Sequence, residues 1–554
     1  MDLQQYLDTA APYYSEELHL IGSVTHSPGY HTRIPDGQWS HQTRQSLDYA
    51  LALLMSGAPA NVARANDIVA KIVSLQDTEP TNSTYGIWSW YYEEPLPKMA
   101  PPDWNWADFI GARLLQIVHG YSDKLSPEIV ASVRSAIGHA GWSIFRRNVN
   151  TGYTNIAVMG GGVSLAAGEL LGEPRLVDYG RRKLANVVAN HTLHGDFNEY
   201  NSPTYTIVVL EEADRFLSLL KDESGRDSME KLRYVAWRTI SEHFHPGTQQ
   251  WTGPNIRAYS DRLSVTGAQF LSERLPIEIK PHASVLAGDP PLHTELITPI
   301  PCPDEFVGRF SALPEDDYTI VRRYNLDGGG GRELFGTTWF SQDAALGSSN
   351  RGGFWNQSRA TIGHWKTDSD SAIVFRTQFL HDGRDFCSVW MENAQAGPRI
   401  LTAATLEKGH GDFHPSLDGP KDGIYRAEDF RLRISLSGVG TAVKVLSATM
   451  FELSAGGHKA VVHVAPSLFD GQPVRWEAGQ GASGVYLDAV CYSGPSKGFD
   501  LDKVGDTAIV FATEILAANA APSLADPVTA TADGRLVATW AVDGGLSVDI
   551  PLRP

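Results

Sequence analysis

The sequence contains few cysteines. Its 554 residues include only Cys302, Cys387 and Cys491, an odd number spread over a long stretch of chain. Such a set forms neither a disulfide framework nor the paired CxxC spacing of a zinc site. We expect three isolated thiols in packed strands and no cofactor.

The sequence also lacks net positive charge. Its 46 lysines and arginines are outnumbered by 64 aspartates and glutamates, which leaves a formal net charge of −18. A nucleic-acid-binding protein would need a basic surface, so no nucleic-acid partner is expected. A polyanionic substrate is still compatible with this composition, because a few basic residues in a cleft can outweigh the global sign.

Long apolar runs are missing too. No stretch approaches the roughly twenty apolar residues of a membrane span, and the N-terminus, MDLQQYLDTAAPYYSEEL, has neither the basic nor the apolar part of a signal peptide. We therefore expect a soluble protein with no membrane partner. It would be secreted or periplasmic if a leader has been removed, and cytoplasmic otherwise.

The first half of the chain has apolar residues at helical spacing. Eight segments show this period, and several end at Gly or at a polar turn, as helices do: 46–57, 60–76, 106–121, 127–147, 155–172, 175–195, 203–221 and 228–244. Consecutive helices joined by short loops predict stacked helical hairpins, an (α/α) toroid, over residues 1–275.

A Pro-rich stretch without helical period, 276–305, reads as a linker, and a different pattern follows it. Short β-branched and aromatic runs separated by turn residues predict an antiparallel β-sandwich over 306–554. The clearest runs are 318–326, 371–380, 430–439, 458–466, 506–515 and 534–550. The glycines at 328–331 lie in a turn without the context of a phosphate-binding loop.

Tryptophans are concentrated in one Pro-interrupted loop, GIWSWYYEEPLPKMAPPDWNWADF (86–109). Aromatic rings with a polar edge suit flat, partly apolar ligands such as sugar rings. The same residues are equally suited to anchoring a long loop on the domain. We expect both roles to be shared among Trp88, Trp90, Trp104 and Trp106.

Two helix starts carry further polar residues. Asn155 lies at the start of one helix, where Asn is most often an N-cap, and three glycines (160–162) follow it and allow close approach of a neighbouring helix or a ligand. In GDFNEYNSPTY (195–205), Ser202 and Pro203 predict the N-cap and first residue of the next helix. Tyr205 then falls on the first turn. Capping leaves Glu199, Tyr200 and Asn201 unexplained, so we interpret them as substrate-binding residues.

A third polar segment, QQWTGPNIRAYSDR (249–262), contains Arg257, Tyr259 and Arg262. Arginine recognises carboxylates through two parallel hydrogen bonds, so this loop is a candidate for binding an anionic group. An ordinary ion-paired surface loop fits the same residues. In the second half of the chain, His364 just before an expected strand is a further candidate, with His410 and His414 as alternatives.

Together these residues resemble the polysaccharide lyases of the heparinase II/III-like and alginate-lyase-like groups. Those enzymes combine a helical toroid with a β-sandwich, an Asn at a helix start, and an acid–x–Ser–Pro–x–Tyr segment that opens a later helix. Asn155 and the segment Glu199–Tyr205 match these features, with one extra residue between the acid and Ser-Pro. The group's His-x-His-x-Asp segment is matched by His364 and Asp368, whereas Lys366 replaces the second His.

The resemblance implies β-elimination at a uronic acid of an anionic polysaccharide or oligosaccharide. Asn155 and Arg257, or Arg262, would neutralise the uronate carboxylate, and Tyr205 would act as acid or base, with His364 as partner or alternative base. Lys366 removes a ligand from the metal site that some members build. No metal is therefore expected at that segment, although a structural divalent metal elsewhere in the β domain stays open.

Two other classes fit the same sequence. A glycoside hydrolase on a helical toroid would need two nearby carboxylates, and the loops offer Glu93, Asp103, Asp108, Asp196 and Glu199. A non-catalytic glycan-binding protein would use the tryptophans alone. Among uronate polymers we favour a non-sulfated one, because the loops contain few basic residues. Endo or exo action stays open.

Overall fold

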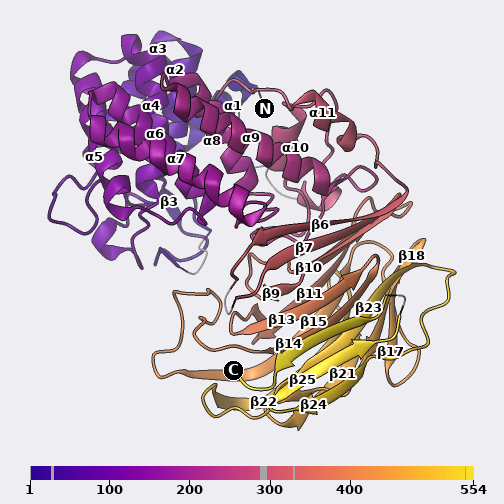
Figure 1. Ribbon diagram of the computed structural model, residues 1–554. Helices are drawn as coiled ribbons and strands as arrows, with labels where there is room; N and C mark the ends of the chain where they lie inside the picture. The colour runs from indigo at the N-terminus through magenta and orange to yellow at the C-terminus, as the bar shows by residue number, and fades with distance from the viewer. Residues whose placement is uncertain (1, 27–29, 287–295, 329–330, 543) are drawn as a thin grey trace. The chain divides into compact units, whose positions relative to one another are not determined.

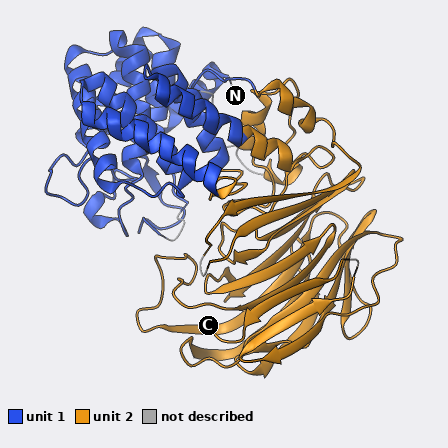
Figure 2. Ribbon diagram, viewed as in Figure 1, with its two compact units in different colours: residues 1–193, 205–236, 289–301 blue, residues 194–204, 237–288, 302–554 orange. Residues whose placement is uncertain are grey.

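The computed structural model describes residues 2–26, 30–286, 296–328, 331–542 and 544–554. The chain forms two compact units (Figure 2). Unit 1 contains residues 1–193, 205–236 and 289–301, and unit 2 contains residues 194–204, 237–288 and 302–554. Residues 237–275, assigned to the helical domain from the sequence, therefore belong to unit 2. Part of the expected linker, 287–295, lies outside the described residues.

The expected order, a helical region followed by an antiparallel β-sandwich, is confirmed (Figure 1). The eight predicted helices are present and begin and end within a few residues of the predicted positions. They are α2 (Thr43–Ser56), α3 (Pro59–Ser74), α4 (Trp106–Tyr121), α5 (Pro127–Arg147), α6 (Thr154–Leu171), α7 (Pro174–His194), α8 (Tyr205–Leu219) and α9 (Glu223–His243). Three short helices were not expected: α1 (Leu3–Ala10), α10 (Val265–Ser272) and α11 (Asp304–Val307).

Local signals in the sequence set the helix ends. The Ser126 side chain accepts a hydrogen bond from the backbone N–H of Ile129, and Pro127 is the first residue of α5. Gly57 and Gly172 take left-handed backbone angles directly after α2 and α6, where residues other than Gly are strained.

The helices of unit 1 form two layers of hairpins. Helices α2, α4, α6 and α8 are largely buried and pack on one another in sequence, whereas α3 and α5 pack on them with one face. Helix α6 is the most buried, and its glycines explain why. A Cβ on Gly160 would meet Asp108 of α4, one on Gly161 would meet Leu184 of α7, and one on Gly162 would meet Phe216 of α8. The predicted close approach of neighbouring helices is therefore confirmed.

Unit 2 contains two large antiparallel sheets. The first has the order β21-β22-β15-β11-β10-β8-β7-β6, with β12 paired to β11. Its strands are β6 (Asp317–Asn325), β7 (Leu334–Ser341), β8 (Ala344–Ser349), β10 (Thr361–Trp365), β11 (Ile373–His381), β12 (Arg384–Asp385), β15 (Ile424–Ser437), β21 (Arg475–Gln480) and β22 (Gly484–Asp500). Strand β15 alternates buried and more exposed residues, as expected for a strand with one face in the core.

The second sheet has the order β16-β17-β18-β23-β14-β13-β9. Its strands are β9 (Arg351–Gly353), β13 (Val389–Ala396), β14 (Arg399–Leu406), β16 (Ala442–Val445), β17 (Met450–Ala455), β18 (His458–Val464) and β23 (Ile509–Ala517). Aromatic and aliphatic side chains from both sheets meet in one apolar core, which makes the pair a sandwich.

A third layer was not expected. Strands β24 (Val528–Ala532), β25 (Arg535–Trp540) and β26 (Leu546–Pro551) form a three-stranded sheet with its own apolar core against β14 and β23. Successive residues of a strand point to opposite faces, so Ile400 belongs to the first core and Leu401 to the second. Both faces of β14 are therefore covered.

Small strands outside the sandwich were also missed. They are β1 (Tyr14–Ser15), β2 (Leu20–Val24) and β3 (Trp39–His41) near the N-terminus, and β4 (Phe244–His245) with β5 (Gln250–Trp251) and β19 (Leu468–Phe469) with β20 (Gln472–Pro473) in unit 2. The three cysteines are free thiols, as expected. Only Cys491 lies in a strand, so the expectation of strand positions was wrong for Cys302 and Cys387. No helix among the described residues is long and apolar enough to cross a membrane.

Candidate active site

Two segments that the sequence marked as polar loops lie together in unit 2. The Glu199 carboxylate accepts a hydrogen bond from Nη1 of Arg257 at 2.8 Å. The Ser202 hydroxyl donates to the backbone carbonyl of Arg257 at 2.5 Å. Segments 199–202 and 251–257 are thus joined by one hydrogen bond between two side chains and one between a side chain and the backbone.

Three side chains hold the Arg257 guanidinium in place: those of Glu199, Gln357 and Trp355. Its Nε and Nη2 both donate to Oε1 of Gln357, at 3.1 and 2.9 Å, and its guanidinium lies over the Trp355 ring, 5.0 Å from the centroid. The side chain of Arg257 retains 18% of its exposed area, compared with 7% for that of Glu199. The arrangement gives a cation whose position is fixed before any ligand arrives, which is the property an anion-recognising group needs.

The Asn201 side chain joins the same two segments, 199–202 and 251–257, by further hydrogen bonds. It has a positive φ of 49°, and its Nδ2 donates to the carbonyls of Thr252 and Pro254 at 2.8 and 2.9 Å. Its Oδ1 accepts from the indole N–H of Trp251. Asn201 is fully buried, so these described contacts are internal to unit 2.

Tyr200 is also fully buried. Its hydroxyl lies 2.7 Å from Nε2 of His243, whose Nδ1 donates to the Thr239 carbonyl, so the hydroxyl is the donor to Nε2. The ring stacks on Tyr324 at a centroid distance of 4.8 Å. Burial raises the pKa of Tyr200 well above its ordinary value and lowers the pKa of His243. Both groups are therefore neutral, and Tyr200 anchors segment 199–202 within unit 2.

His364 lies in β10 and is 1% exposed. Its Nε2 donates to the backbone carbonyl of Asp261 at 2.8 Å, and burial lowers its pKa to about 4. The imidazole is therefore neutral at pH 7, with the proton on Nε2 and the lone pair on Nδ1.

The loop that His364 holds carries two residues singled out from the sequence. Arg262 donates through Nε to the Ala372 carbonyl at 2.9 Å and through Nη2 to the Ser437 carbonyl at 3.3 Å. Tyr259 is 55% exposed. Asp261 between them pairs with Arg359 and Arg376, which together lower its pKa against the raising effect of burial.

Sequence reasoning missed the residues that brace Arg257 and Asp261. Gln357, Trp355 and Arg359 all come from RGGFWNQSRA (351–360), a polar and aromatic loop of the kind that was noticed elsewhere in the chain. Its contact with 255–258 depends on a long-range bridge between Asn255 and Arg359, which has no local signature.

The other predicted residues lie in unit 1. Asn155 is the second residue of α6, so it is not the N-cap that the sequence suggested, and the capping position is held by Tyr153. Asn155 is fully buried. Helix α8 begins at Tyr205, two residues later than expected, and Pro203 precedes it in a turn. Tyr205 is partly exposed.

The four tryptophans of the loop differ in exposure and in their hydrogen bonds. Trp88 is fully buried and donates to the Ile72 carbonyl at 2.8 Å. Trp104 donates to the Ser83 carbonyl, and Trp106 donates to the Thr43 hydroxyl. Trp90 and Trp106 are partly exposed, and their rings lie 5.1 Å apart as an aromatic pair at the start of α4.

Asp108, one of the carboxylates considered for a hydrolase, is 2% exposed at the first turn of α4. Burial raises its pKa to about 8, although Arg147 at 3.9 Å lowers it. It is therefore a protonated, neutral acid at pH 7. No group of three or more His, Cys, Asp or Glu residues with metal-binding geometry occurs within the described parts of the chain.

Comparisons with known proteins give low-similarity matches. A protein-family profile described as "Domain of unknown function (DUF8769)" matches residues 24–271. A search of curated proteins found no match. Among solved structures, a heparinase III is 11% identical with a TM-score of 0.44 and covers 96% of this chain and 86% of its own.

Two further structures belong to the same group. A heparinase III gene product with methylated lysines is 9% identical, with a TM-score of 0.36 over 99% of this chain and 90% of its own. A heparan sulfate lyase from Pedobacter heparinus is 10% identical, with a TM-score of 0.33 over 100% and 94%.

Proposed function

We propose that this protein is a polysaccharide lyase that cleaves a uronic-acid-containing glycan by β-elimination. The observation that carries the proposal is the fixed guanidinium of Arg257. It is bound to Glu199 of the segment that resembles the lyase motif, six residues before Tyr205 along the chain. A lyase requires such a cation, because the proton on C5 of a uronate is very weakly acidic while the neighbouring carboxylate keeps its charge.

In the proposed reaction, Arg257 binds the uronate carboxylate and stabilises the enolate that forms when the C5 proton leaves. Asn155 is fully buried, so we assign it no contact with the substrate. The C5–H electrons form the C4–C5 double bond, and the C4–O bond breaks toward the leaving sugar. Tyr205 takes the C5 proton as tyrosinate, or gives a proton to the leaving oxygen as the neutral phenol. A free tyrosine has a pKa near 10, so the base role requires that a nearby cation lower it.

The remaining predicted residues receive supporting roles. His364 positions the loop that contains Tyr259 and Arg262 through the Asp261 carbonyl. Arg262 donates to backbone carbonyls, and this is why we assign carboxylate binding to Arg257. Trp90 and Trp106 are our choice for the sugar platform, with Trp104 at its edge. A single substrate-facing arginine fits one carboxylate better than an array of sulfates, which favours a non-sulfated polymer.

The test is Tyr205→Phe, assayed by the ultraviolet absorbance of the unsaturated product. Polymers of glucuronate, mannuronate, guluronate and iduronate serve as substrates. We expect the variant to lose at least about 100-fold in rate, the lower range for removing a general acid or base. Tyr121→Phe is the matched control, since Tyr121 is also a partly exposed tyrosine of unit 1 but lies at the end of α4; it should keep full activity.

Retained activity in Tyr205→Phe would remove Tyr205 from the mechanism. Failure of the unchanged protein to form an unsaturated product from any of these polymers would refute the lyase proposal.

A glycoside hydrolase is the second candidate because of Asp108. A buried carboxyl with a raised pKa is what a hydrolase uses as general acid. Asp103 lies five residues earlier and accepts a hydrogen bond from the indole N–H of Trp90 at 3.2 Å, which places a second carboxylate on the aromatic loop. A hydrolase would release a new reducing end without an unsaturated product, and Asp108→Asn would abolish that release.

A further inference from the structure

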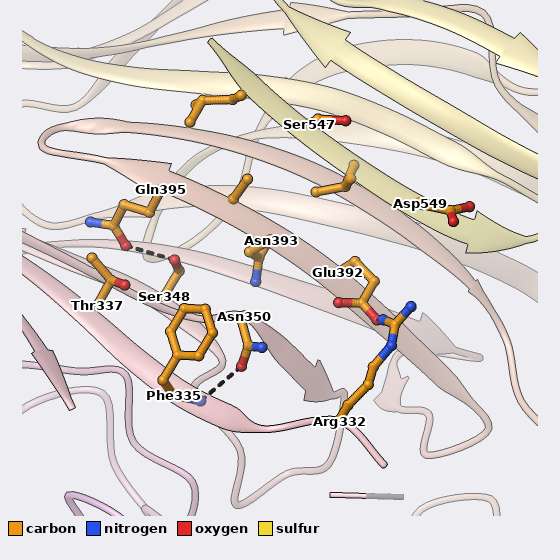
Figure 3. Close-up of a pocket in the computed structure, with 13 residues that line it drawn as sticks. Arg332, Phe335, Thr337, Ser348, Asn350, Glu392, Asn393, Gln395, Ser547 and Asp549 are labelled. Carbon is orange, nitrogen blue, oxygen red and sulfur yellow. Dashed lines mark hydrogen bonds and ion pairs between the residues drawn. The ribbon is translucent and has the colours of Figure 1, made fainter. Parts of the chain in front are cut away.

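A separate pocket lies within unit 2, and none of the residues proposed for elimination lines it. Its volume is about 400 Å³, which falls within the range of small-molecule sites. Strands from three sheets contribute its walls: β7 and β8 of the first sheet, β13 of the second and β26 of the third layer (Figure 3). Most of the lining residues lie in strands, and only Arg332 and Asn350 lie in the turns next to them, so the walls of the pocket are largely fixed by the sheets.

The polar side chains in the pocket are held in place by internal hydrogen bonds. Ser348 donates to Oε1 of Gln395 at 2.6 Å, and Gln395 donates to the Leu346 and Gly397 carbonyls at 3.0 Å. Asn350 accepts from the backbone N–H of Phe335 at 2.9 Å. A side-chain amide has two N–H donors and two acceptor lone pairs. Such residues therefore keep capacity for a ligand while their orientation is fixed.

Two carboxylates face this space, and each is braced by arginine. Asp549 accepts from Nε of Arg535 through both oxygens, at 2.9 and 3.1 Å. Glu392 pairs with Arg332, and Arg351 lies 3.8 Å away. A carboxylate offers about four acceptor sites, so each retains sites for hydroxyl groups. Figure 3 shows Asp549 and Ser547 on one side of the pocket, with Phe335 and Asn350 on the other.

The residues that line the pocket restrict the class of ligand that it can bind. The lining contains two carboxylates, Asp549 and Glu392, against one guanidinium, that of Arg332, so it favours a neutral ligand over an anion. Hydroxyl and amide groups give an apolar ligand no gain over water. The Phe335 ring is 36% exposed, and it adds one flat apolar surface to these hydrogen-bonding groups. A pyranose ring combines an apolar face with hydroxyls around its edge, and pockets for such ligands pair an aromatic ring with a few fixed polar groups.

We propose that this pocket binds a neutral sugar unit, with Asp549 and Glu392 accepting hydrogen bonds from ring hydroxyls and Phe335 packed against a ring face. Strands β7, β13 and β26 thereby give unit 2 a carbohydrate-binding site of its own. Failure of this proposal is distinguishable from failure of the proposed lyase activity, because the four neutral sugars used as ligands below contain no uronate.

The test is ligand-observed NMR on the full chain, titrated with glucose, galactose, mannose and N-acetylglucosamine. Glucuronate serves as the charged counterpart. We expect at least one neutral sugar to bind. Asp549→Asn and Phe335→Ala should each weaken that binding about tenfold, the loss expected when one charge-assisted hydrogen bond or one packed ring face is removed.

Matched controls exist for both variants. Asp422 pairs with Arg426 and has a side chain 48% exposed, compared with 47% for Asp549, so Asp422→Asn controls for loss of a half-exposed ion pair. Phe145 is 37% exposed in unit 1, so Phe145→Ala controls for loss of a surface ring. Both controls should bind as the unchanged protein does, with folding checked by circular dichroism.

Three results would overturn the proposal. The first is no binding of any of the four neutral sugars. The second is glucuronate binding as tightly as the best neutral sugar, which would contradict two carboxylates as acceptors. The third is an equal loss in the controls and in Asp549→Asn and Phe335→Ala, which would place the binding elsewhere.

Discussion

The interiors of the two units are built in different ways. In unit 1, buried arginines pair with carboxylates across the inner helices: Arg113 lies 2.5 Å from Asp48 of α2 and 2.9 Å from Glu211 of α8. Arg215, fully buried, lies 3.1 Å from Glu212. The sandwich of unit 2 is centred instead on apolar side chains such as Phe379, Phe430 and Leu432.

The difference indicates which substitutions of buried residues each unit tolerates. A buried charge is acceptable only with its partner present, so the helical unit is sensitive to the loss of any single group in the network. An apolar core is sensitive to volume, and small changes have graded effects. The predictions below test this contrast by changing one residue of each kind.

The largest expected effect is in the helical unit. Arg215→Met leaves Glu212, 2% exposed, without its nearest cation. We expect a loss of about 3–5 kcal/mol in the free energy of unfolding, measured by urea titration. Hydrogen exchange at peptide resolution should show the loss of protection in α8. The double variant with Glu212→Gln should recover part of the loss, and a single-variant effect below about 1 kcal/mol would contradict the contrast.

The second prediction concerns pH. The pKa of Asp108 is about 8 in the folded state, above its ordinary value of 3.8, so its contribution to stability is complete below about pH 4 and is lost as the pH rises toward 8. One proton contributes at most about 1.4 kcal/mol per pH unit. Asp108→Asn should flatten this dependence and unfold less readily than the unchanged protein at pH 8. Parallel stability curves for the two proteins would refute the assignment.

The third prediction concerns a buried polar pair inside unit 2, Tyr200 and His243. Tyr200→Phe removes the hydroxyl that donates to Nε2 of His243 and leaves a buried acceptor. We expect a loss of about 1–3 kcal/mol by the same titration. Tyr486→Phe, at a partly buried tyrosine of β22, should change stability by less than about 0.5 kcal/mol. Equal effects of the two substitutions would mean that the His243 contact contributes nothing.

The smallest effect should come from the sandwich core. Ile434, fully buried in β15, loses one methyl group in Ile434→Val. We expect about 0.5–1.5 kcal/mol of destabilisation, with exchange in β15 increased and exchange in α8 unchanged. Increased exchange in α8 would show that the two interiors are not energetically separate.

The sequence predicted the helices well because each is long and carries apolar residues at helical spacing, and the strands of the sandwich because β-branched runs are local signals. It missed the third layer, since the period-two pattern of β25 is the same whether the strand belongs to a two-layer or a three-layer arrangement. It also missed β1–β5, which are too short to show any period.

For the candidate site, the residue types in the sequence indicated which segments are polar, but they did not indicate which residues contact one another. The polar segments around Glu199 and Arg257 were identified, and the structure brings them together. Tyr200 and Asn201 were interpreted as cleft lining, whereas their described contacts lie inside unit 2. Only the fold could reveal this, because both depend on partners such as His243 and Thr252 that lie more than forty residues away in the chain.

The glycines of α6 have a consequence for how the chain can change in length. Gly160, Gly161 and Gly162 each face a different helix, so all three must keep their angular positions at once. An insertion of one residue before them would rotate every one by about 100° around the helix axis. Larger side chains would then face the neighbouring helices at places that leave no room for them. Loops of unit 1 can lengthen independently, whereas an insertion or deletion in α6 before Gly162 displaces contacts with three helices at once.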